Sequence, residues 1–216
     1  MKEKISLFCN VRKSSVIQNR TVDCLYAVPL MLEEEGLARE VCNYLRLDRY
    51  VPDNRKWEQM INNVRNIKDK EVKVAIVGKY VKLEDSYISV IESLTHAGYA
   101  NNVKVKINLV DSETINAQNI EEKLKGYNAI VVSGGFGNRG IEERHRHRYE
   151  YNNSFKEQLE KAGLICSWTS PDGNLVEIVE MKNHPYFIAG QFHPELKSRP
   201  NRPAPLFVGL IKACIK

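Results

Sequence analysis

The run Val72-Lys73-Val74-Ala75-Ile76-Val77, closed by Gly78, decides the fold of this chain. Its β-branched residues favour a strand, and the glycine ends it. The elements that follow alternate between helix and strand, and they are expected over residues 86–98, 103–110, 116–125 and 129–132. Ser86 is the candidate N-cap of the first of these helices. This β-α-β-α-β order predicts a parallel, doubly wound sheet with its binding residues at the carboxyl ends of the strands.

A glycine-rich turn, Ser133-Gly134-Gly135-Phe136-Gly137, lies at such an end, directly after the third strand. The alternating order then breaks, because Arg144-His145-Arg146-His147-Arg148-Tyr149 follows where the next helix is expected. Beyond this block the pattern predicts a helix over 154–162, strands near 164–168 and 175–181 joined by a Pro171-Asp172-Gly173-Asn174 hairpin turn, and a helix over 206–214.

The stretch Gln191-Phe192-His193-Pro194-Glu195 carries the clearest chemical signal. It follows the apolar run 186–189, which is expected to form a buried strand. His193 and Glu195 are two residues apart, so on an extended backbone their side chains leave the same face. A carboxylate beside an imidazole can hold its tautomer and stabilise the imidazolium, as a general base requires. Such a base needs a nucleophile to activate.

The bulk properties exclude several classes of protein. With 216 residues, 43% hydrophobic and 27% charged, the chain can bury one full core as an ordinary globular protein. Its net charge of +5 favours small anions such as nucleotides but is too diffuse to indicate nucleic acid. The sequence has no membrane-spanning run and no signal-peptide pattern. Five unpatterned cysteines without a CxxC pair suit the cytoplasm and argue against structural zinc.

The first 70 residues differ in character from the rest of the chain. Residues 1–47 contain a strand-like run at 5–9 and a helical pattern over 28–47 that Gly36 interrupts. Such a segment cannot bury its own apolar faces, so it is interpreted as part of a larger domain. Residues 48–70 are charged and rich in asparagine, which predicts a linker with a short helix around 57–67. A separate domain is expected over 71–216.

Five stretches together carry a resemblance to a known family. They are Lys4-Ile5-Ser6-Leu7-Phe8-Cys9, Val77-Gly78-Lys79-Tyr80, residues 133–140, residues 143–150 and residues 191–195. In this order they resemble the CTP synthase family, whose members aminate UTP to CTP with ATP and glutamine. The Arg-His-Arg-His-Arg-Tyr-Glu block is specific to this family and argues against another triad hydrolase, such as a γ-glutamyl hydrolase.

The resemblance implies a flavodoxin-like α/β fold with a mostly parallel sheet, the class I glutamine amidotransferase domain, preceded by the end of a synthetase domain. Family members release ammonia through a Cys-His-Glu triad and a glutamyl thioester. His193 and Glu195 match two members of that triad. Gly135 matches the oxyanion-hole position, where an N–H faces the developing negative charge. Arg148 matches the arginine that binds the carboxylate of glutamine.

Nucleotide contacts also follow from the resemblance alone. Lys4 matches a pyrimidine-nucleotide contact, and Arg20, Thr21 and Val22 occupy ATP-contact positions. ATP and Mg²⁺ belong to the intact family enzyme, and no cofactor or metal is expected on this chain alone, which has no GxxxxGK[ST] pattern. The expected partners are L-glutamine, UTP or CTP and ATP, together with further copies of the chain, since family members are tetramers. No nucleic acid or membrane partner is expected.

One departure from the family is serious. The Gly-Ile-Cys-Leu-Gly-Met elbow that carries the nucleophile is absent, and the sequence closes across Glu142 and Glu143, which predicts an internal deletion near 141–143. A strained nucleophile turn requires small residues on both sides of the cysteine. This chain does not provide them at any of its five cysteines, Cys9, Cys24, Cys42, Cys166 and Cys214. Cys166 comes closest, but it suits a small core residue on a strand. The chain as it stands is expected not to hydrolyse glutamine.

Several alternatives remain open. Either the sequence covers only parts of a longer enzyme, or it is a natural remnant that folds without the elbow. The first is favoured, because removing a central strand, turn and helix exposes apolar sheet edges. In function, the alternative to CTP synthase is a non-catalytic glutaminase-like module that binds a ligand or mediates assembly.

Each motif also has an ordinary structural explanation. A His-Pro pair after a strand is usually a turn, and a Gly-Gly-Phe-Gly segment is usually a generic loop. The arginine block could be a solvated basic strand or an RNA contact, and metal binding by His145 and His147 lacks a third ligand. Lys79 and Tyr80 either border the glutamine pocket or lie on the surface. His96 and His184 are interpreted as structural residues.

Overall fold

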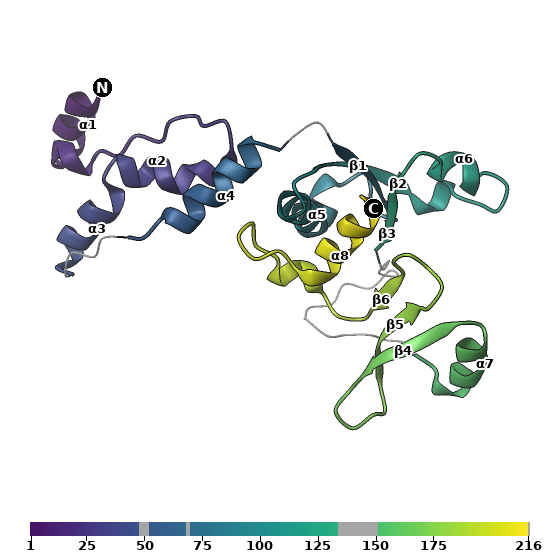
Figure 1. The fold of residues 1–216 in the computed structure, drawn as a ribbon. Helices are drawn as coiled ribbons and strands as arrows, with labels where there is room; N and C mark the ends of the chain where they lie inside the picture. Colours follow the sequence, from purple (N-terminus) through teal and green to yellow (C-terminus); the bar gives the residue numbers. More distant parts are fainter. Residues whose placement is uncertain (48–51, 68–69, 134–150, 216) are drawn as a thin grey trace. The chain divides into compact units, whose positions relative to one another are not determined.

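A computed structural model describes residues 1–47, 52–67, 70–133 and 151–215 (Figure 1). The chain divides into two compact units, Met1–Asn66 and Ile67–Lys216, each of which is treated by itself. Gly135, Arg148 and the expected junction at 141–143 lie outside the described residues. Within the described ranges, none of the helices has the length and apolar character needed to cross a membrane.

The first unit is helical. Its helices are α1 (Lys2–Cys9), α2 (Val28–Glu34), α3 (Leu37–Leu45) and α4 (Arg55–Arg65). Gly36 separates α2 from α3 with a φ of 86°, a left-handed conformation that glycine adopts without steric cost. Ile61 is 1% exposed and forms the core with Ala27 and Met31. The Trp57 indole donates a hydrogen bond of 2.8 Å to the Tyr26 carbonyl, which fixes α4 against the segment before α2.

The strand expected over residues 5–9 is wrong, because this segment belongs to α1. A strand needs a neighbour for its backbone hydrogen bonds, and the described part of this unit contains no strand. A helix instead satisfies those groups within itself. It ends at Asn10, whose φ of 51° is left-handed and whose N–H donates to the Ser6 carbonyl.

The second unit contains the predicted parallel sheet. Its strands are β1 (Glu71–Gly78), β2 (Lys104–Asp111) and β3 (Ala129–Val132), in the order β2-β1-β3. Both neighbours run parallel to β1, so that Val74 lies between Ile107 and Ala129. Helix α5 (Ile88–Ala100) connects β1 to β2, and α6 (Ile120–Leu124) connects β2 to β3 (Figure 1). The alternating pattern of the sequence is therefore confirmed.

Two helix starts differ from the prediction. Helix α6 begins four residues after Asn116, because the Asn116 and Asn119 side chains accept hydrogen bonds from nearby backbone N–H groups and hold a turn. Helix α5 begins at Ile88, after a 3₁₀ turn over Glu84–Tyr87, and Ser86 is not its N-cap. That turn brings Tyr87, 5% exposed, into the core.

The main core lies on one face of the parallel sheet. Helices α5 and α8 (Pro205–Cys214) lie side by side against it (Figure 1). The buried core residues of these elements are Val72, Val74, Ile76, Leu94, Ala97, Ala129, Phe207 and Ile211. Alternate side chains of the strands therefore pack against the apolar faces of α5 and α8 in one layer.

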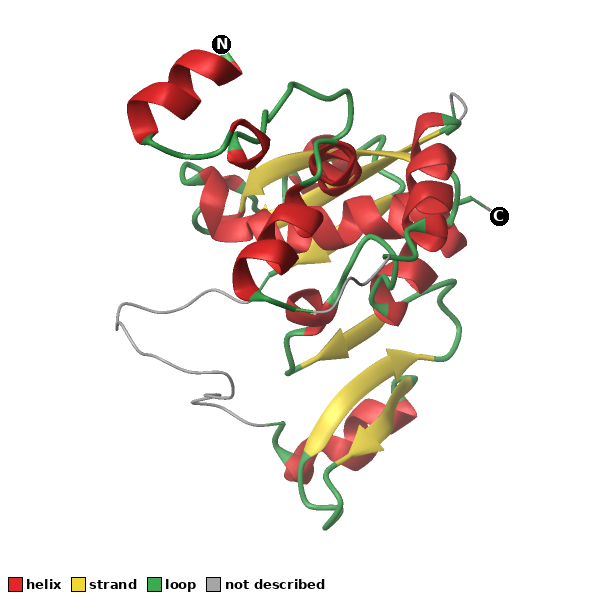
Figure 2. Ribbon diagram, turned by 90° about the vertical axis from the view of Figure 1, so that its left-hand side faces the viewer, coloured by secondary structure: helices red, strands yellow, loops and turns green. Residues whose placement is uncertain are grey.

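A second, antiparallel sheet follows, with α7 (Lys156–Lys161) beside it (Figure 2). Its strands are β4 (Leu164–Thr169), β5 (Val176–Met181) and β6 (Ile188–Gly190), in that order. The hairpin turn between β4 and β5 is confirmed, with Gly173 at a φ of 74° and Asp172 accepting from Ser170 and Asn174.

The buried strand expected over 186–189 is only partly correct. Strand β6 starts at Ile188, and its residues are half-buried or exposed because it lies at the edge of its sheet. Phe187, before it, is 39% exposed. The Tyr186 hydroxyl donates to the Leu206 carbonyl at 2.6 Å, so this segment is tied to the start of α8.

Candidate active site

The carboxyl end of β1 is the place where the sheet order predicts a ligand site. In the order β2-β1-β3, the connection from β1 leads to one neighbour and the connection from β2 leads to the strand on the other side of β1. Ligands of such sheets bind in the crevice outside this switch point, at the carboxyl ends of the strands. Ser133, after β3, donates its N–H to the Val77 carbonyl on β1 at 3.2 Å. The glycine-rich turn that contains Gly135 follows Ser133 in sequence, beyond the described residues.

Tyr87 packs directly against Gly78 at this end of the sheet. A Cβ atom on Gly78 would lie 2.5 Å from the Tyr87 Cζ and closer still to its hydroxyl, so no other residue fits. The Tyr87 hydroxyl accepts a hydrogen bond from the Tyr80 N–H at 3.1 Å. Lys79 lies 3.5 Å from Glu113 and is half-exposed, which places its ammonium at the surface beside the end of β2.

The structure brings His193 and Glu195 together as the sequence predicted. The His193 Nδ1 and the Glu195 Oε1 are 2.7 Å apart. Because an ionised carboxylate can only accept, Nδ1 carries the hydrogen and Nε2 presents its lone pair. The imidazole is 46% exposed and the carboxylate 13%, so the base is accessible while its partner is sheltered. This arrangement can hold a neutral imidazole ready to take a proton.

The backbone that produces this pair is not the extended strand of the prediction. His193 precedes a 3₁₀ helix over Pro194–Lys197, and its φ of −104° and ψ of 82° are not those of a strand. Proline at the first helical position starts this turn. The two side chains therefore meet across one tight turn rather than along one face of a strand.

None of the five thiols is hydrogen-bonded to His193 in the described part of the chain. All five cysteines are free, and the described partner of the His193 ring is Glu195. The Cys166 thiol, on β4, interacts with the Tyr151 hydroxyl and raises the pKa of Tyr151 to about 12. The Cys214 thiol donates to the Leu210 and Asn128 carbonyls, and burial raises its pKa. A raised pKa disfavours the thiolate that a nucleophile requires.

The residues expected to contact nucleotides lie in the first unit. One of them, Arg20, is already paired with two carboxylates. Its guanidinium is 3.1 Å from Glu34 and 3.7 Å from Glu35. The Lys2 ammonium, hydrogen-bonded to Glu35, lowers the pKa of that carboxyl, so it stays ionised. Arg20 is therefore engaged by carboxylates, and a phosphate would have to displace them to contact its guanidinium.

The other three positions expected to contact nucleotides differ in exposure. Lys4 and Thr21 are exposed, and Val22 is half-buried. Within the described ranges, no group of three or more His, Cys, Asp or Glu side chains is arranged to hold a metal ion.

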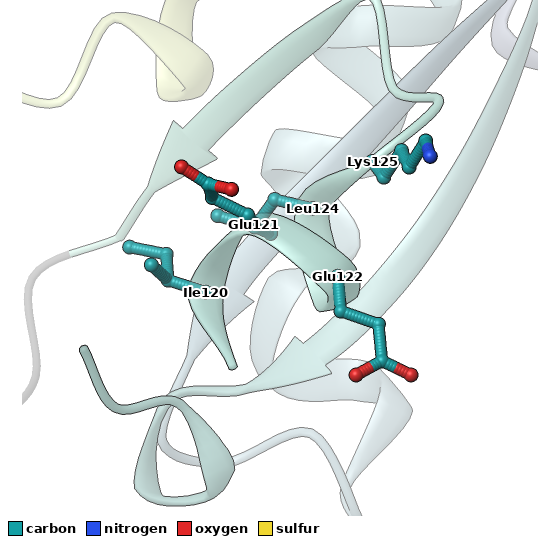
Figure 3. A pocket seen from close by; sticks show the side chains of 5 residues that line it. All are labelled: Ile120, Glu121, Glu122, Leu124 and Lys125. Atoms are coloured by element: carbon teal, nitrogen blue, oxygen red, sulfur yellow. The ribbon is translucent and has the colours of Figure 1, made fainter. Parts of the chain in front are cut away.

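A surface hollow beside α6 does not contribute to the site (Figure 3). It is lined by Ile120, Glu121, Glu122, Leu124 and Lys125. Figure 3 shows these side chains spreading from one short helix instead of converging on a common point. The hollow contains neither His193 nor Glu195 and lacks the converging polar groups of a substrate pocket.

Sequence reasoning missed the residues that hold the His193 turn. Ser93 and His96 on α5 contact this turn and Ser198 after it. His96 was interpreted as structural, and its contact with Ser198 was not foreseen. A polar residue on the buried face of a predicted helix is the signal that could have indicated such a contact.

Comparisons with known proteins agree with this geometry. The family model described as glutamine amidotransferase class-I matches residues 82–144 and, separately, 138–213, and the model described as CTP synthase N-terminus matches residues 1–47. A solved structure, the Trypanosoma brucei CTPS glutaminase domain with bound acivicin, superposes with a TM-score of 0.58 and 26% identity, covering 67% of this chain and 94% of that one.

Curated CTP synthases match the whole chain. The Clostridium kluyveri enzyme is 39% identical and a Bacillus cereus enzyme is 36% identical, both over 310 aligned positions. These positions cover 100% of the chain but 58% of each relative, so the chain spans little more than half of their length. The alignment has 94 more positions than the 216 residues of the chain. By these matches the chain belongs to the CTP synthase family, with a segment that matches the family's N-terminal model followed by a class I glutamine amidotransferase domain.

Proposed function

We propose that this chain is the glutaminase end of a CTP synthase that keeps the base of its catalytic triad and lacks the nucleophile. In the intact enzyme the domain would release ammonia from L-glutamine, and the synthetase domain would use that ammonia to aminate UTP to CTP with ATP. The single observation that carries the proposal is the hydrogen bond of 2.7 Å between His193 and Glu195 in a chain of this family.

The proposed roles follow from the chemistry of amide hydrolysis. A cysteine thiolate would attack the glutamine amide carbon, and the His193 imidazolium would protonate the leaving ammonia. The same imidazole would then take a proton from the water that hydrolyses the glutamyl thioester, with Glu195 stabilising its charged form. We assign the oxyanion contact to the Gly135 N–H and the glutamine carboxylate to Arg148.

Two observations support a loss of the nucleophile segment near residues 141–143. The relatives have 94 aligned positions that this chain does not fill. The two matches to the glutamine amidotransferase family meet at residues 138–144, which contain the proposed junction. Without a thiol beside His193 the covalent route is closed, because the members of a triad act as a unit.

The wider activity is proposed for the intact enzyme. There, ATP with Mg²⁺ would activate UTP, with Lys4 proposed as a pyrimidine-nucleotide contact and Arg20, Thr21 and Val22 as ATP contacts. The enzyme is proposed to act in the cytoplasm as a homo-oligomer, with a tetramer as the expected state. Domain boundaries at 47 and 70 are proposed with it, the segment between them being a linker whose helix α4 packs onto the first unit.

A glutaminase assay on the 216-residue chain tests the proposal. Ammonia release from L-glutamine is expected to be absent, and calorimetric titration with L- and D-glutamine separates binding from turnover. Tight binding of L-glutamine without turnover would favour the alternative, a binding or assembly module. Ammonia release that depends on His193 would refute the absence of a nucleophile.

A restored chain gives the complementary test. Inserting the missing segment of the Clostridium kluyveri relative at residues 141–143 is expected to produce glutaminase activity. His193→Ala in the restored chain should then lower the rate by at least about a thousandfold. Equal activity with and without His193 would remove this residue from the mechanism.

A further inference from the structure

The described part of the chain has three buried polar residues, and all three belong to one contact. Ser93 is 1% exposed, His96 is 5% exposed and Ser198 is 5% exposed. Ser93 and His96 lie on the buried face of α5, and Ser198 directly follows the 3₁₀ turn that contains Glu195. Buried polar groups are retained only where they are hydrogen-bonded, so this concentration at one place needs an explanation.

The contact joins α5 to the turn at two points. The Ser93 hydroxyl donates to the Ser89 carbonyl at 2.7 Å and approaches the Glu195 carbonyl at 3.3 Å. One turn along the helix, His96 Nδ1 lies 3.1 Å from the Ser198 hydroxyl oxygen. The Glu195 carbonyl also accepts the Ser198 N–H at 3.3 Å, which closes the turn between the two points.

The hydrogen bonds define the tautomer of His96. The Ser198 hydroxyl oxygen accepts the Ala204 N–H at 3.2 Å, so its hydrogen is available to donate to His96 Nδ1. The ring hydrogen then lies on Nε2, which faces the Glu92 carboxylate at 3.6 Å. With this assignment the neutral His96 ring lies between the Glu92 carboxylate, an acceptor, and the Ser198 hydroxyl, a donor.

This chain of groups is not a second hydrolytic triad. It has the serine, histidine and carboxylate of one, but the Ser198 hydroxyl is buried and its oxygen already accepts a backbone N–H. A nucleophile must reach its substrate, and no substrate can reach this one. The arrangement suits a fixed support better than a reacting centre.

We propose that His96 and Ser198, with Ser93 as a second contact, are positioning residues that hold the His193–Glu195 pair in its working geometry. This inference rests on the proposed function of that pair. The Glu195 backbone is held at its carbonyl, so its side chain leaves the turn in a fixed direction toward the His193 Nδ1. Catalytic side chains need such support from the groups behind them, since small misplacements cost much of the rate.

Two further details agree with a support at this place. Arg199 donates to the Leu196 and Ser198 carbonyls at 3.2 and 2.7 Å, so the carbonyls of the turn are satisfied from the other side. Ala204, 5% exposed, begins the approach to α8, and its N–H is the one that Ser198 accepts. The turn is therefore fastened to both α5 and the start of α8.

The ring tautomer of His193 provides the test, and it needs neither glutamine binding nor turnover. The ¹³Cδ2 and ¹⁵N chemical shifts of the His193 ring in the full chain report whether Nδ1 or Nε2 carries the hydrogen. In the unmodified chain the Nδ1–H form is expected to dominate. In His96→Leu, which removes the hydrogen bond, the ratio of the two tautomers should shift toward Nε2–H by about two- to tenfold.

The matched control is His96→Asn, whose amide can replace Nδ1 as partner of Ser198 and should restore the ratio. Ser198→Ala, a smaller change, should shift it in the same direction as His96→Leu. A folded His96→Leu or Ser198→Ala chain with an unchanged His193 ratio would overturn the proposal, as would His96→Asn behaving like His96→Leu. Failure of both deletions to fold would assign these residues to the core and overturn it too.

Discussion

The contact between Gly78 and Tyr87 predicts a large effect from a small substitution at the edge of the proposed site. Gly78→Ala would place a Cβ 2.5 Å from the Tyr87 Cζ, below any real Cβ contact, and Tyr87 is 5% exposed with little room to move. Overpacking of this kind costs about 1–3 kcal/mol. Displacing Tyr87 would also weaken its hydrogen bond from the Tyr80 N–H, which is worth about 0.5–1.5 kcal/mol. A loss of about 1.5–4.5 kcal/mol in the free energy of unfolding is therefore expected.

Urea unfolding followed by far-UV circular dichroism measures this loss, and hydrogen exchange of the β1 amides assigns it to the parallel sheet. The matched control is Tyr87→Ala, which empties the space that the new methyl group needs. In that background Gly78→Ala should be neutral or stabilising, since Gly78 has no positive φ. Alanine lowers the conformational entropy of the unfolded chain, which raises the free energy of unfolding by about 0.4–1 kcal/mol. An equal loss in both backgrounds, or none in the parent chain, would refute the packing argument.

Two further predictions concern pH and association. Burial lowers the pKa of His96, helped by Arg199 and opposed by Glu92, so the folded pKa lies below the ordinary 6.5. The contribution of neutral His96 to the free energy of unfolding is therefore fully present above pH 6.5 and is lost as the pH falls below 6.5. Urea unfolding should show a free energy of unfolding that declines with falling pH, and His96→Asn should reduce this decline. Equal declines in the two chains would contradict this prediction. On the open edge of β3, Val132 is 75% exposed, and among the described strands only β1 pairs with β3. Val132→Lys should lower self-association, measured by sedimentation velocity, because a charge on an edge strand opposes pairing with another chain. Leu83→Lys is the control, since Leu83 is 63% exposed and lies outside the strands. Equal effects of the two substitutions would show that the β3 edge does not mediate self-association.

The parts of the fold that the sequence predicted are those set by local patterns. Strand β1 is apolar along almost its whole length and is the central strand, buried on both faces, so its run is unmistakable. The sharp turn at Gly173 follows from four consecutive turn-forming residues. The error at residues 5–9 has the opposite origin, because a short apolar run does not show whether a neighbouring strand exists.

The candidate site divides in the same way. His193 and Glu195 are two positions apart, so their pairing could be predicted even though the turn that joins them was taken for a strand. The contacts from Ser93 to Glu195 and from His96 to Ser198 each span 102 positions. No periodicity or spacing encodes such a contact. It depends on how α5 packs against a loop that follows β6, the last described strand, in the sequence.

This locality also determines what the His193–Glu195 pair can indicate about activity. The pair forms within one turn, and this turn is hydrogen-bonded to α5 and to the segment before α8. The pairing of His193 with Glu195 therefore does not by itself report a nucleophile opposite it. A triad works as a unit, so an intact pair contributes little when the attacking atom is missing. The geometry of the His193–Glu195 pair thus agrees with the family, and the comparison of the 216-residue chain with the restored chain measures whether this domain can turn over glutamine.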